Sequence, residues 1–284
     1  MRILLFLLTN FAIMAVLLLT TKLLGLDRAL GSSYSSLFAF ALVIGMGGSM
    51  ISLFLSKWMA KKSMRVEIID PNNIRDKRVA LLYKQVEDIS KKAGINTPEF
   101  GIYKGSPNAF ATGWNKNDAL VAVSTGLMDL MNADEIEAVI AHEIGHVANG
   151  DMVTLSLIQG VINALVIFLA RIVGGIVDKA ILKTRNGYGM GYYATVFIAE
   201  MVLGILASII VFWFSRFREF RADEASAKYV GTHKMVAALR KLQSLQNNPS
   251  LPKEMAAFGI SGGGLMGLFS SHPPLEKRVE NLLK

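Results

Sequence analysis

Long runs of uncharged, mostly apolar residues mark the first part of the chain. Residues 3–21 and residues 29–56 each lack any charged side chain, and each run is long enough to cross the roughly 30 Å hydrocarbon layer of a bilayer as a helix. A cleavable signal peptide is the alternative for the first run, but that run ends at Lys22 and the second apolar run follows soon after it. Gly45, Gly47 and Gly48 are predicted to let the second helix pack closely on another one.

Two further apolar runs lie in the second half of the chain, at residues 152–170 and 192–215, with Glu200 as the only charge inside them. We interpret residues 152–215 as a helical hairpin that forms the third and fourth membrane segments, either crossing the bilayer or dipping partly into it. In an antiparallel hairpin, the residue numbers of two positions that face each other add up to a nearly constant value. This rule pairs Arg171 with Glu200 and also returns Glu219 to the level of His146. An ion pair would offset the cost of two charges in hydrocarbon; the alternative is that each side chain reaches an interface separately.

The segment between these membrane regions has the pattern of a folded, soluble part. Residues 75–93 alternate charged and apolar side chains at helical spacing, and Gly94 is a natural stop. Residues 100–103 and 119–124 are short extended runs, which predict a small sheet.

A metal-binding motif lies at the centre of the chain, His142-Glu143-Ile144-Gly145-His146. On a helix, two histidines four residues apart lie on one face and can bind the same ion. This spacing is typical of zinc sites in which the glutamate acts on a water molecule. Asn132 and the acidic residues after it favour a capped helix start. The alternative is a pair of surface histidines on an ordinary helix, and Gly145 weakens the helix prediction.

A catalytic zinc ion requires a third protein ligand and one open position for water. The chain has no cysteine, so this ligand must be a histidine or a carboxylate. The downstream candidates in polar sequence are Glu219, Asp223, Glu224, His233, Glu254 and His272. Glu219 and Asp223 are four residues apart on one predicted helix face, so one can bind the metal while the other supports a ligand histidine. An ordinary surface ion pair is the alternative for Glu219.

The charge distribution is explained by a membrane rather than by nucleic acid. The net charge is +8, and hydrophobic residues make up 52% of the chain. Basic residues gather beside the apolar runs, and the positive-inside rule places the part of the chain after the second run in the cytoplasm. The basic residues that follow this run are Lys57, Lys61, Lys62 and Arg65. The sequence lacks the interleaved basic and aromatic residues of a nucleic-acid surface, so we expect no nucleic-acid partner.

Several motifs together give the whole chain a resemblance to a known family. They are P-N-A-F-A-T-G at residues 107–113, H-E-I-G-H with A-N-G-D-M at residues 142–152, R-E-F-R-A-D at residues 218–223 and S-H-P-P-L-E-K-R at residues 271–278. The chain resembles the HtpX family of bacterial membrane-bound zinc metalloproteases, which is related to the eukaryotic CaaX prenyl endoproteases. The resemblance implies a mainly α membrane protein with a small β-sheet and a zincin-like H-E-x-x-H metalloprotease domain.

The resemblance also implies roles for individual residues. His142, His146 and Glu219 would bind one Zn²⁺ per subunit, Glu143 would be the catalytic base, and Asp223 would support a ligand. In the expected mechanism, zinc lowers the pKa of a water molecule. Glu143 takes a proton as that water attacks the scissile carbonyl, and later passes the proton to the departing amine.

Two further stretches gain roles from the same resemblance. Asn108, Ala109 and Phe110 resemble an edge strand along which a peptide substrate lies, whereas the alternative is a plain Pro-Asn turn. His272 and Arg278 match a motif that in relatives points back at the active site, where they could stabilise the negative oxygen of the tetrahedral intermediate. The alternative is a loop that leads into the last helix.

We therefore expect two transmembrane helices in residues 1–60, a catalytic part in residues 61–151, the hairpin in residues 152–215 and a second catalytic part in residues 216–284. The expected protein is a zinc endopeptidase of the bacterial inner membrane, with its catalytic part in the cytoplasm. The resemblance alone implies a stress-response role, in which unfolded or damaged membrane proteins are the substrates. The alternatives are an intramembrane metalloprotease, which the polar residues around the motif disfavour, and a membrane scaffold or channel with a structural metal site.

Overall fold

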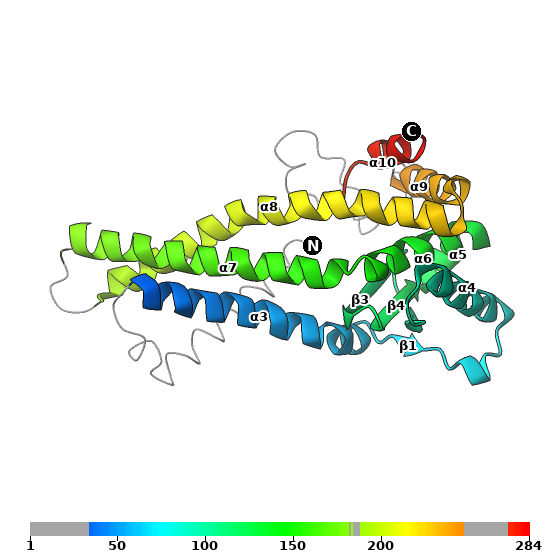
Figure 1. The fold of residues 1–284 in the computed structure, drawn as a ribbon, viewed down its shortest axis with the longest axis horizontal. Coiled ribbons are helices and arrows are strands. Elements are labelled where there is room, and N and C mark those ends of the chain that lie inside the picture. Colours follow the sequence, from blue (N-terminus) through cyan, green and yellow to red (C-terminus); the bar gives the residue numbers. More distant parts are fainter. Residues whose placement is uncertain (1–33, 182, 184–187, 247–271) are drawn as a thin grey trace. The chain divides into compact units, whose positions relative to one another are not determined.

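The computed structural model describes residues 34–181, 183, 188–246 and 272–284 (Figure 1). The predicted first membrane segment, residues 3–21, and the candidate ligand Glu254 lie outside these residues. The chain divides into two compact units. We call the first the helical unit, which consists of the residues up to Ser52 together with Leu155–Val211. We call the second the sheet unit, which consists of Leu53–Thr154 and Phe212–Lys284.

In the described part of the chain, three long helices form the helical unit, and each of them continues into the sheet unit. They are α3 (Tyr34–Ser63), α7 (Asp151–Ile176, extended by a π-helical turn at Val177–Ile181) and α8 (Met190–Val230) (Figure 1). Among the described residues, these three helices are long and apolar enough to cross a membrane. They correspond to the second, third and fourth predicted membrane segments.

Small residues allow α3 and α7 to approach closely within the helical unit. A Cβ atom added to Gly45 would lie 2.7 Å from Cα of Ala164 and 2.8 Å from the carbonyl oxygen of Gly160. Only the hydrogen of glycine fits at such a distance. A Cβ atom on Gly47, in contrast, would meet no atom within 4 Å. The predicted close packing is therefore confirmed at Gly45 and does not extend to Gly47.

The ion pair predicted for the hairpin is present between α7 and α8. Arg171 Nη1 lies 3.1 Å from Glu200 Oε1, and the two side chains are only 14% and 9% exposed. Close to this pair, a Cβ atom on Gly174 would clash with the side chains of Val196 and Tyr192. The hairpin therefore has the register that the antiparallel rule predicts.

A four-stranded sheet with the order β1-β2-β4-β3 forms one layer of the sheet unit. The strands are β1 (Glu67–Ile68), β2 (Glu99–Tyr103), β3 (Ala109–Asn115) and β4 (Asp118–Ser124). Strands β2 and β4 are parallel, whereas β1 pairs with β2 and β3 pairs with β4 in antiparallel fashion. Ala109 and Phe110 pair with Val123 and Ala122, so these two residues belong to a strand at the edge of the described sheet, whereas Asn108 lies just before it.

Helices cover the sheet and complete the core of the sheet unit. They are a 3₁₀ turn at Pro71–Asn73, α4 (Lys77–Ala93), α5 (Thr125–Leu130), α6 (Ala133–Ala148), α9 (Thr232–Gln246) and α10 (Leu275–Leu282). Helix α4 begins at Lys77 because the Asp76 side chain caps it, and it ends where Gly94 adopts a left-handed conformation with φ 67°.

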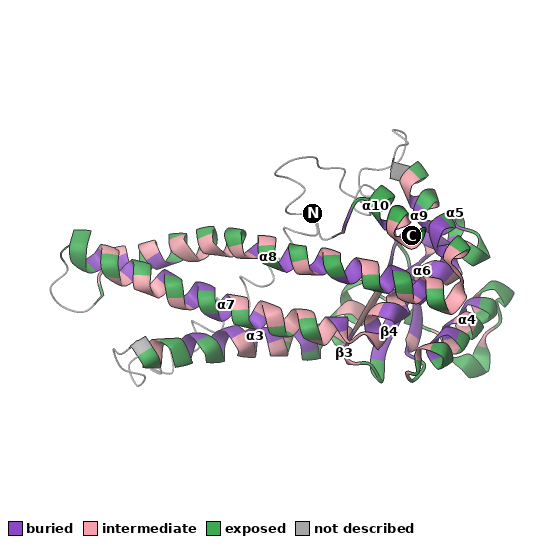
Figure 2. Cartoon of the chain, turned by 45° about the horizontal axis from the view of Figure 1, so that its top comes forward, coloured by how far each residue is buried: buried purple, intermediate pink, exposed green. Residues whose placement is uncertain are grey.

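Helix α6 lies at the centre of this unit and packs against α4, α9, β3 and β4. Figure 2 shows buried positions along α6 and β4. Three isoleucines of α6, at positions 136, 140 and 144, are fully buried in the same core as Val121 and Val123 of β4. The described structure is thus mainly helical with a small mixed sheet, as the resemblance implies.

Candidate metal centre

Local sequence determines where α6 begins and how closely it approaches α8. The Asn132 side chain accepts a hydrogen bond from the Glu135 backbone, and the Glu135 carboxylate accepts one from the Asn132 backbone, which completes a capping box. A Cβ atom on Gly145 would lie 3.0 Å from Cβ of Ala225 on α8. Gly145 therefore weakens the isolated helix but permits the close contact that brings Glu219 of α8 to the motif.

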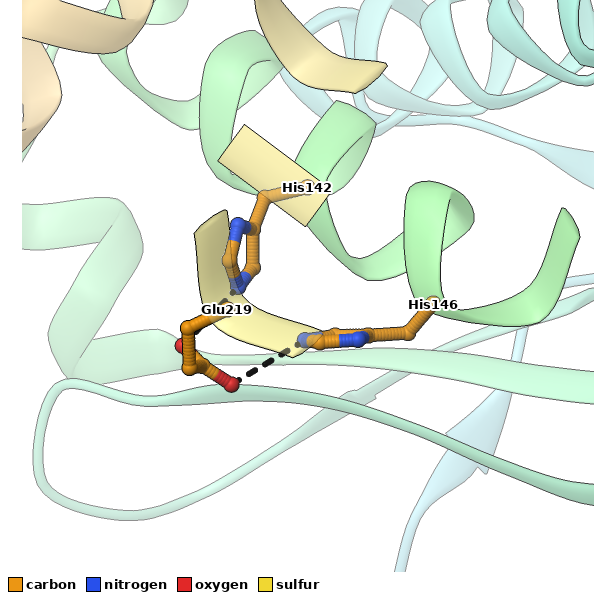
Figure 3. Close-up of side chains that lie close together, drawn as sticks. All are labelled: His142, His146 and Glu219. Carbon is orange, nitrogen blue, oxygen red and sulfur yellow. Dashed lines mark ion pairs between the residues drawn. The ribbon is translucent and has the colours of Figure 1, made fainter. Parts of the chain in front are cut away.

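Three side chains from α6 and α8 converge on one point (Figure 3). The ligand atoms of His142, His146 and Glu219 all lie within 4.8 Å of one another and could hold a metal ion. We call these three residues the metal group. Nε2 of His142 is 3.5 Å from Glu219 Oε2, and Nε2 of His146 is 3.3 Å from Glu219 Oε1. The structure thus brings together, in a largely buried position, the three residues that the resemblance indicates as ligands.

The opposite nitrogen of each imidazole contacts a buried aspartate. His142 Nδ1 lies 2.9 Å from Asp223 Oδ1, and His146 Nδ1 lies 2.6 Å from Asp151 Oδ2. Asp223 is fully buried and Asp151 is 2% exposed. Because Nδ1 is occupied in both rings, Nε2 is the atom that each ring directs towards Glu219.

Sequence reasoning indicated Asp223 as a supporting residue but missed Asp151. The glycine at position 150 is the one sequence signal for it, because a glycine at the end of a helix often marks a reversal of the chain. In the structure Gly150 adopts φ 68°.

Two residues from the end of the chain reach the same site. Arg278, which is 5% exposed, forms a two-pronged contact with Asp223, with Nε 2.7 Å from Oδ2 and Nη2 2.6 Å from Oδ1. Arg278 Nη1 is also 3.4 Å from Glu219 Oε2, and His272 Nδ1 is 2.7 Å from that oxygen. The segment around His272 therefore lies beside the metal group and also leads into α10.

Neighbouring carboxylates favour the charged form of both imidazoles. Burial lowers the pKa of His142, but hydrogen bonds to Asp223 and Glu219 raise it by more, so the pKa of His142 lies above its usual value. Burial also lowers the pKa of His146, whereas hydrogen bonds to Asp151 and Glu219 and the charges of Glu219 and Glu143 raise it to about 10. A metal ion must displace these protons, because only the deprotonated Nε2 of an imidazole can bind it.

The surroundings of Glu219 keep its side chain as a carboxylate. Nitrogen atoms of His142, His272 and Arg278 lie 2.7–3.5 Å from its buried Oε2 atom. Burial raises the pKa of Glu219, but the charge of His272 and hydrogen bonds with the neighbouring histidines lower it well below its usual value. With two imidazole nitrogens on the same side, the donor set suits a zinc ion.

The remaining residues singled out from the sequence lie in other places. Glu143 follows His142 on α6 and is partly exposed, whereas His233 and Glu224 are exposed and do not belong to the metal group. Asn108 immediately precedes β3, and its backbone N–H donates to Ser124 Oγ at 2.8 Å.

Comparison with known proteins gives consistent results over nearly the full length. The model of "Peptidase family M48" matches residues 76–284. Protease HtpX of Pseudomonas aeruginosa is 58% identical over 287 residues, which covers 99% of this chain and 98% of the relative. Protease HtpX of Thioalkalivibrio sulfidiphilus is 55% identical over 288 residues, which covers 98% and 97%. These matches confirm the resemblance that the motifs indicate.

A solved structure is similar in fold. The crystal structure of Ste24p from S. mikatae matches with a TM-score of 0.64 at 17% sequence identity, covering 87% of this chain and 58% of that chain. The present chain thus spans somewhat more than half of Ste24p, and the likeness concerns the arrangement of the backbone.

Proposed function

This chain belongs to peptidase family M48, and on that premise we propose that it hydrolyses peptide bonds at a membrane with Zn²⁺ held by His142, His146 and Glu219. Membership of the family makes the chain a metalloendopeptidase and removes the alternative of a scaffold or channel whose metal is only structural. Its three long apolar helices, together with the HtpX relatives, make it a membrane protein.

The observation that carries the zinc proposal is the convergence of both Nε2 atoms on the Glu219 carboxylate. A set of two histidines and one glutamate leaves a fourth position open for water, as catalytic zinc sites require. When bound there, zinc supplies Lewis-acid chemistry, which lowers the pKa of water and polarises the scissile carbonyl. Asp223 and Asp151 orient the imidazoles, and Arg278 holds Asp223 by its two contacts.

Glu143 acts as the general base in this proposal. It follows a ligand directly on α6 and is partly exposed, so its carboxylate can reach a water molecule in the open position. It takes a proton as the water attacks the carbonyl and then delivers that proton to the departing amine. His272 and Arg278, which lie beside Glu219, stabilise the negative oxygen of the tetrahedral intermediate.

The substrate lies along the edge strand β3 in an extended form. Strand β3 pairs with β4 on one side and packs against α6, which carries the motif. A peptide added to this edge at Asn108, Ala109 and Phe110 is recognised through its backbone, so binding there has little sequence preference. Such binding suits unfolded segments of many proteins.

We place the enzyme in the bacterial inner membrane with the sheet unit in the cytoplasm. The support is the group of basic residues after the second apolar run, which favours a cytoplasmic location. A membrane-bound protease that binds its substrate through the peptide backbone suits quality control of misfolded or damaged membrane proteins, and its HtpX relatives are consistent with a stress-response role.

The variant Glu143→Gln tests this function most simply. We expect the purified variant to bind one zinc ion per chain and to digest an unfolded protein about 10²–10⁴-fold more slowly than the wild type, because it keeps the ligands but loses the base. Glu224→Gln, which changes an exposed carboxylate outside the metal group, is the matched control and should retain full activity. Wild-type cleavage by the Glu143 variant would exclude Glu143 as the base.

A further inference from the structure

An aspartate contacts Nδ1 of each histidine of the metal group, although the resemblance implies a supporting role for Asp223 alone. We propose that Asp151 is a positioning residue that fixes the orientation and tautomer of His146, and that Arg218 holds Asp151 in place for this task. The inference rests on the proposed zinc site and assigns two further residues to it.

Asp151 and Asp223 make the same kind of contact with their histidines, from a buried carboxylate oxygen to Nδ1. Asp151 Oδ2 lies 2.6 Å from His146 Nδ1, compared with 2.9 Å between Asp223 and His142. Both aspartates are at most 2% exposed. A carboxylate on Nδ1 keeps the proton on that nitrogen and leaves Nε2 free to bind a metal. Without Asp151, the ring of His146 can rotate or carry its proton on the ligand atom.

The backbone explains how a residue so close in sequence reaches the ring. Helix α6 ends at Ala148, and α7 begins at Asp151. Gly150 between them adopts φ 68°, a conformation that residues with a side chain rarely adopt. This reversal returns the Asp151 side chain to the last turn of α6, where His146 lies.

A simpler role for Asp151 is to begin α7, because acidic residues are favourable in the first turn of a helix. The contacts are different from those of a helix cap, since the described hydrogen bonds of its carboxylate go to His146. The two roles also differ in what they affect. A helix start affects the stability of the fold, whereas a partner of Nδ1 affects zinc affinity, and asparagine lacks the charge that favours a proton on Nδ1.

Arg218 ties the position of Asp151 to the helix that carries the third ligand. Its Nη1 donates to the backbone carbonyl of Asp151 at 2.9 Å, and its Nη2 lies 3.4 Å from Ser215 Oγ. The side chain is only 8% exposed, and the next residue on α8 is Glu219. Helix α8 therefore supplies one ligand directly and fixes the support of another. Arg278 holds Asp223 differently, by donating to both oxygens of its carboxylate.

Zinc affinity is the most direct test, because it does not depend on turnover. The full-length protein in detergent would be titrated with zinc against a chromogenic chelator, for the wild type and for Asp151→Ala, Asp151→Asn and Arg218→Met. We expect Asp151→Ala to weaken zinc binding about 10–100-fold, as loss of such a partner typically does. Asp151→Asn should weaken it less, and Arg218→Met should have a similar intermediate effect.

Asp134→Asn is the matched control, because it removes an exposed carboxylate from α6 that pairs with Lys234 away from the metal group. It should keep wild-type zinc affinity. The electronic spectrum of the cobalt-substituted protein gives a second readout: we expect it to change in both Asp151 variants and to stay unchanged in Asp134→Asn. A merely structural role for Asp151 would not alter the geometry around the metal.

The outcomes separate this inference from the function on which it rests. If the wild type itself binds no zinc, the proposed metal site fails. If the wild type binds zinc and both Asp151 variants bind it equally well with an unchanged cobalt spectrum, only the positioning role is overturned. Should Asp151→Ala fail to fold, as judged by circular dichroism without metal, the nearly isosteric Asp151→Asn decides the question by the same two measurements.

Discussion

Protonation of His146 competes with binding of a metal ion. The ring of His146 is buried between Asp151 and Glu219, and that of His142 between Asp223 and Glu219. Burial alone would lower the pKa of His146, but its carboxylate partners raise it to about 10. The metal-free site therefore favours the charged form of His146, whereas a bound metal ion would take the place of its proton.

We predict that zinc raises the Tm of the metal-free protein more at pH 8 than at pH 6. The folded pKa of His146, about 10, exceeds the unfolded value of about 6.5. Its protonation therefore stabilises the metal-free fold fully below about pH 6.5, and this contribution is lost as the pH rises through the folded pKa. Zinc competes with the same protons, so its affinity increases over that range. Thermal unfolding of chelator-treated protein, with and without added zinc between pH 6 and 9, measures both effects.

A control for this pH dependence is available on α9. His233 is exposed and outside the metal group, so His233→Gln should keep the dependence, whereas His146→Gln should lose most of it. A larger zinc-induced shift at pH 6 than at pH 8 would contradict the assignment of the protons to the metal group.

Spacing along a helix is a local property, which is why the sequence placed His142 and His146 on one face. The position of Asp151 depends instead on a single backbone reversal at Gly150, and periodicity carries no information about such a turn. A glycine inside a helix, such as Gly145, lowers the helix propensity of the sequence. The structure explains why a glycine stands there, because α6 and α8 cross closely at Gly145 and Ala225.

Among the helices, α3 and α7 are in contact at a position where the size of one side chain decides the packing. We predict that Gly45→Ala destabilises the protein by about 1–3 kcal/mol, because the added methyl group would overlap the backbone of Ala164. Gly47→Ala is the control, since its methyl group meets open space; it should be neutral or stabilising by up to about 1 kcal/mol. Unfolding by sodium dodecyl sulfate in mixed micelles, followed by circular dichroism, distinguishes the two. Equal stability of both variants would argue against close packing at Gly45.

The ion pair between Arg171 and Glu200 supplies a second test of the helical unit. Glu200→Ala leaves a largely buried guanidinium without its carboxylate, and we expect a loss of about 3 kcal/mol in the free energy of unfolding. The double variant Arg171→Met with Glu200→Met removes both charges and should recover most of that loss. A neutral result for Glu200→Ala, measured in the same micelles, would mean that the pair does not contribute to stability.

The register of the long helices could be predicted from the sequence, whereas the order of the strands could not. The register of α7 against α8 follows from antiparallel geometry once the two apolar runs and their charges are recognised. The extent of β3 and the order β1-β2-β4-β3 depend on pairings between distant residues, and the sequence shows no local trace of the parallel contact between β2 and β4.

The molecule as a whole builds its metal group from separate parts of the chain. The sheet unit consists of Leu53–Thr154 and Phe212–Lys284, and the two segments are joined through the apolar hairpin. His146 and Glu219 lie 3.3 Å apart although the entire hairpin separates them in sequence. The position of Glu219 beside His146 could be predicted because the two apolar runs of the hairpin are of similar length. The support that Asp151 and Arg218 give to His146 could not be predicted, because it depends on tertiary contacts at the start of α7.

We propose that the metal group holds a zinc ion, which the protease requires for cleavage. The most direct measurement is the digestion of an unfolded protein by the detergent-purified full-length chain before chelation, after chelation and after zinc is added back. We predict that the chelator abolishes cleavage and that about one equivalent of zinc per chain restores it, while Glu219→Ala stays inactive even with excess zinc. Undiminished cleavage by chelated protein shown to be free of metal would contradict the account.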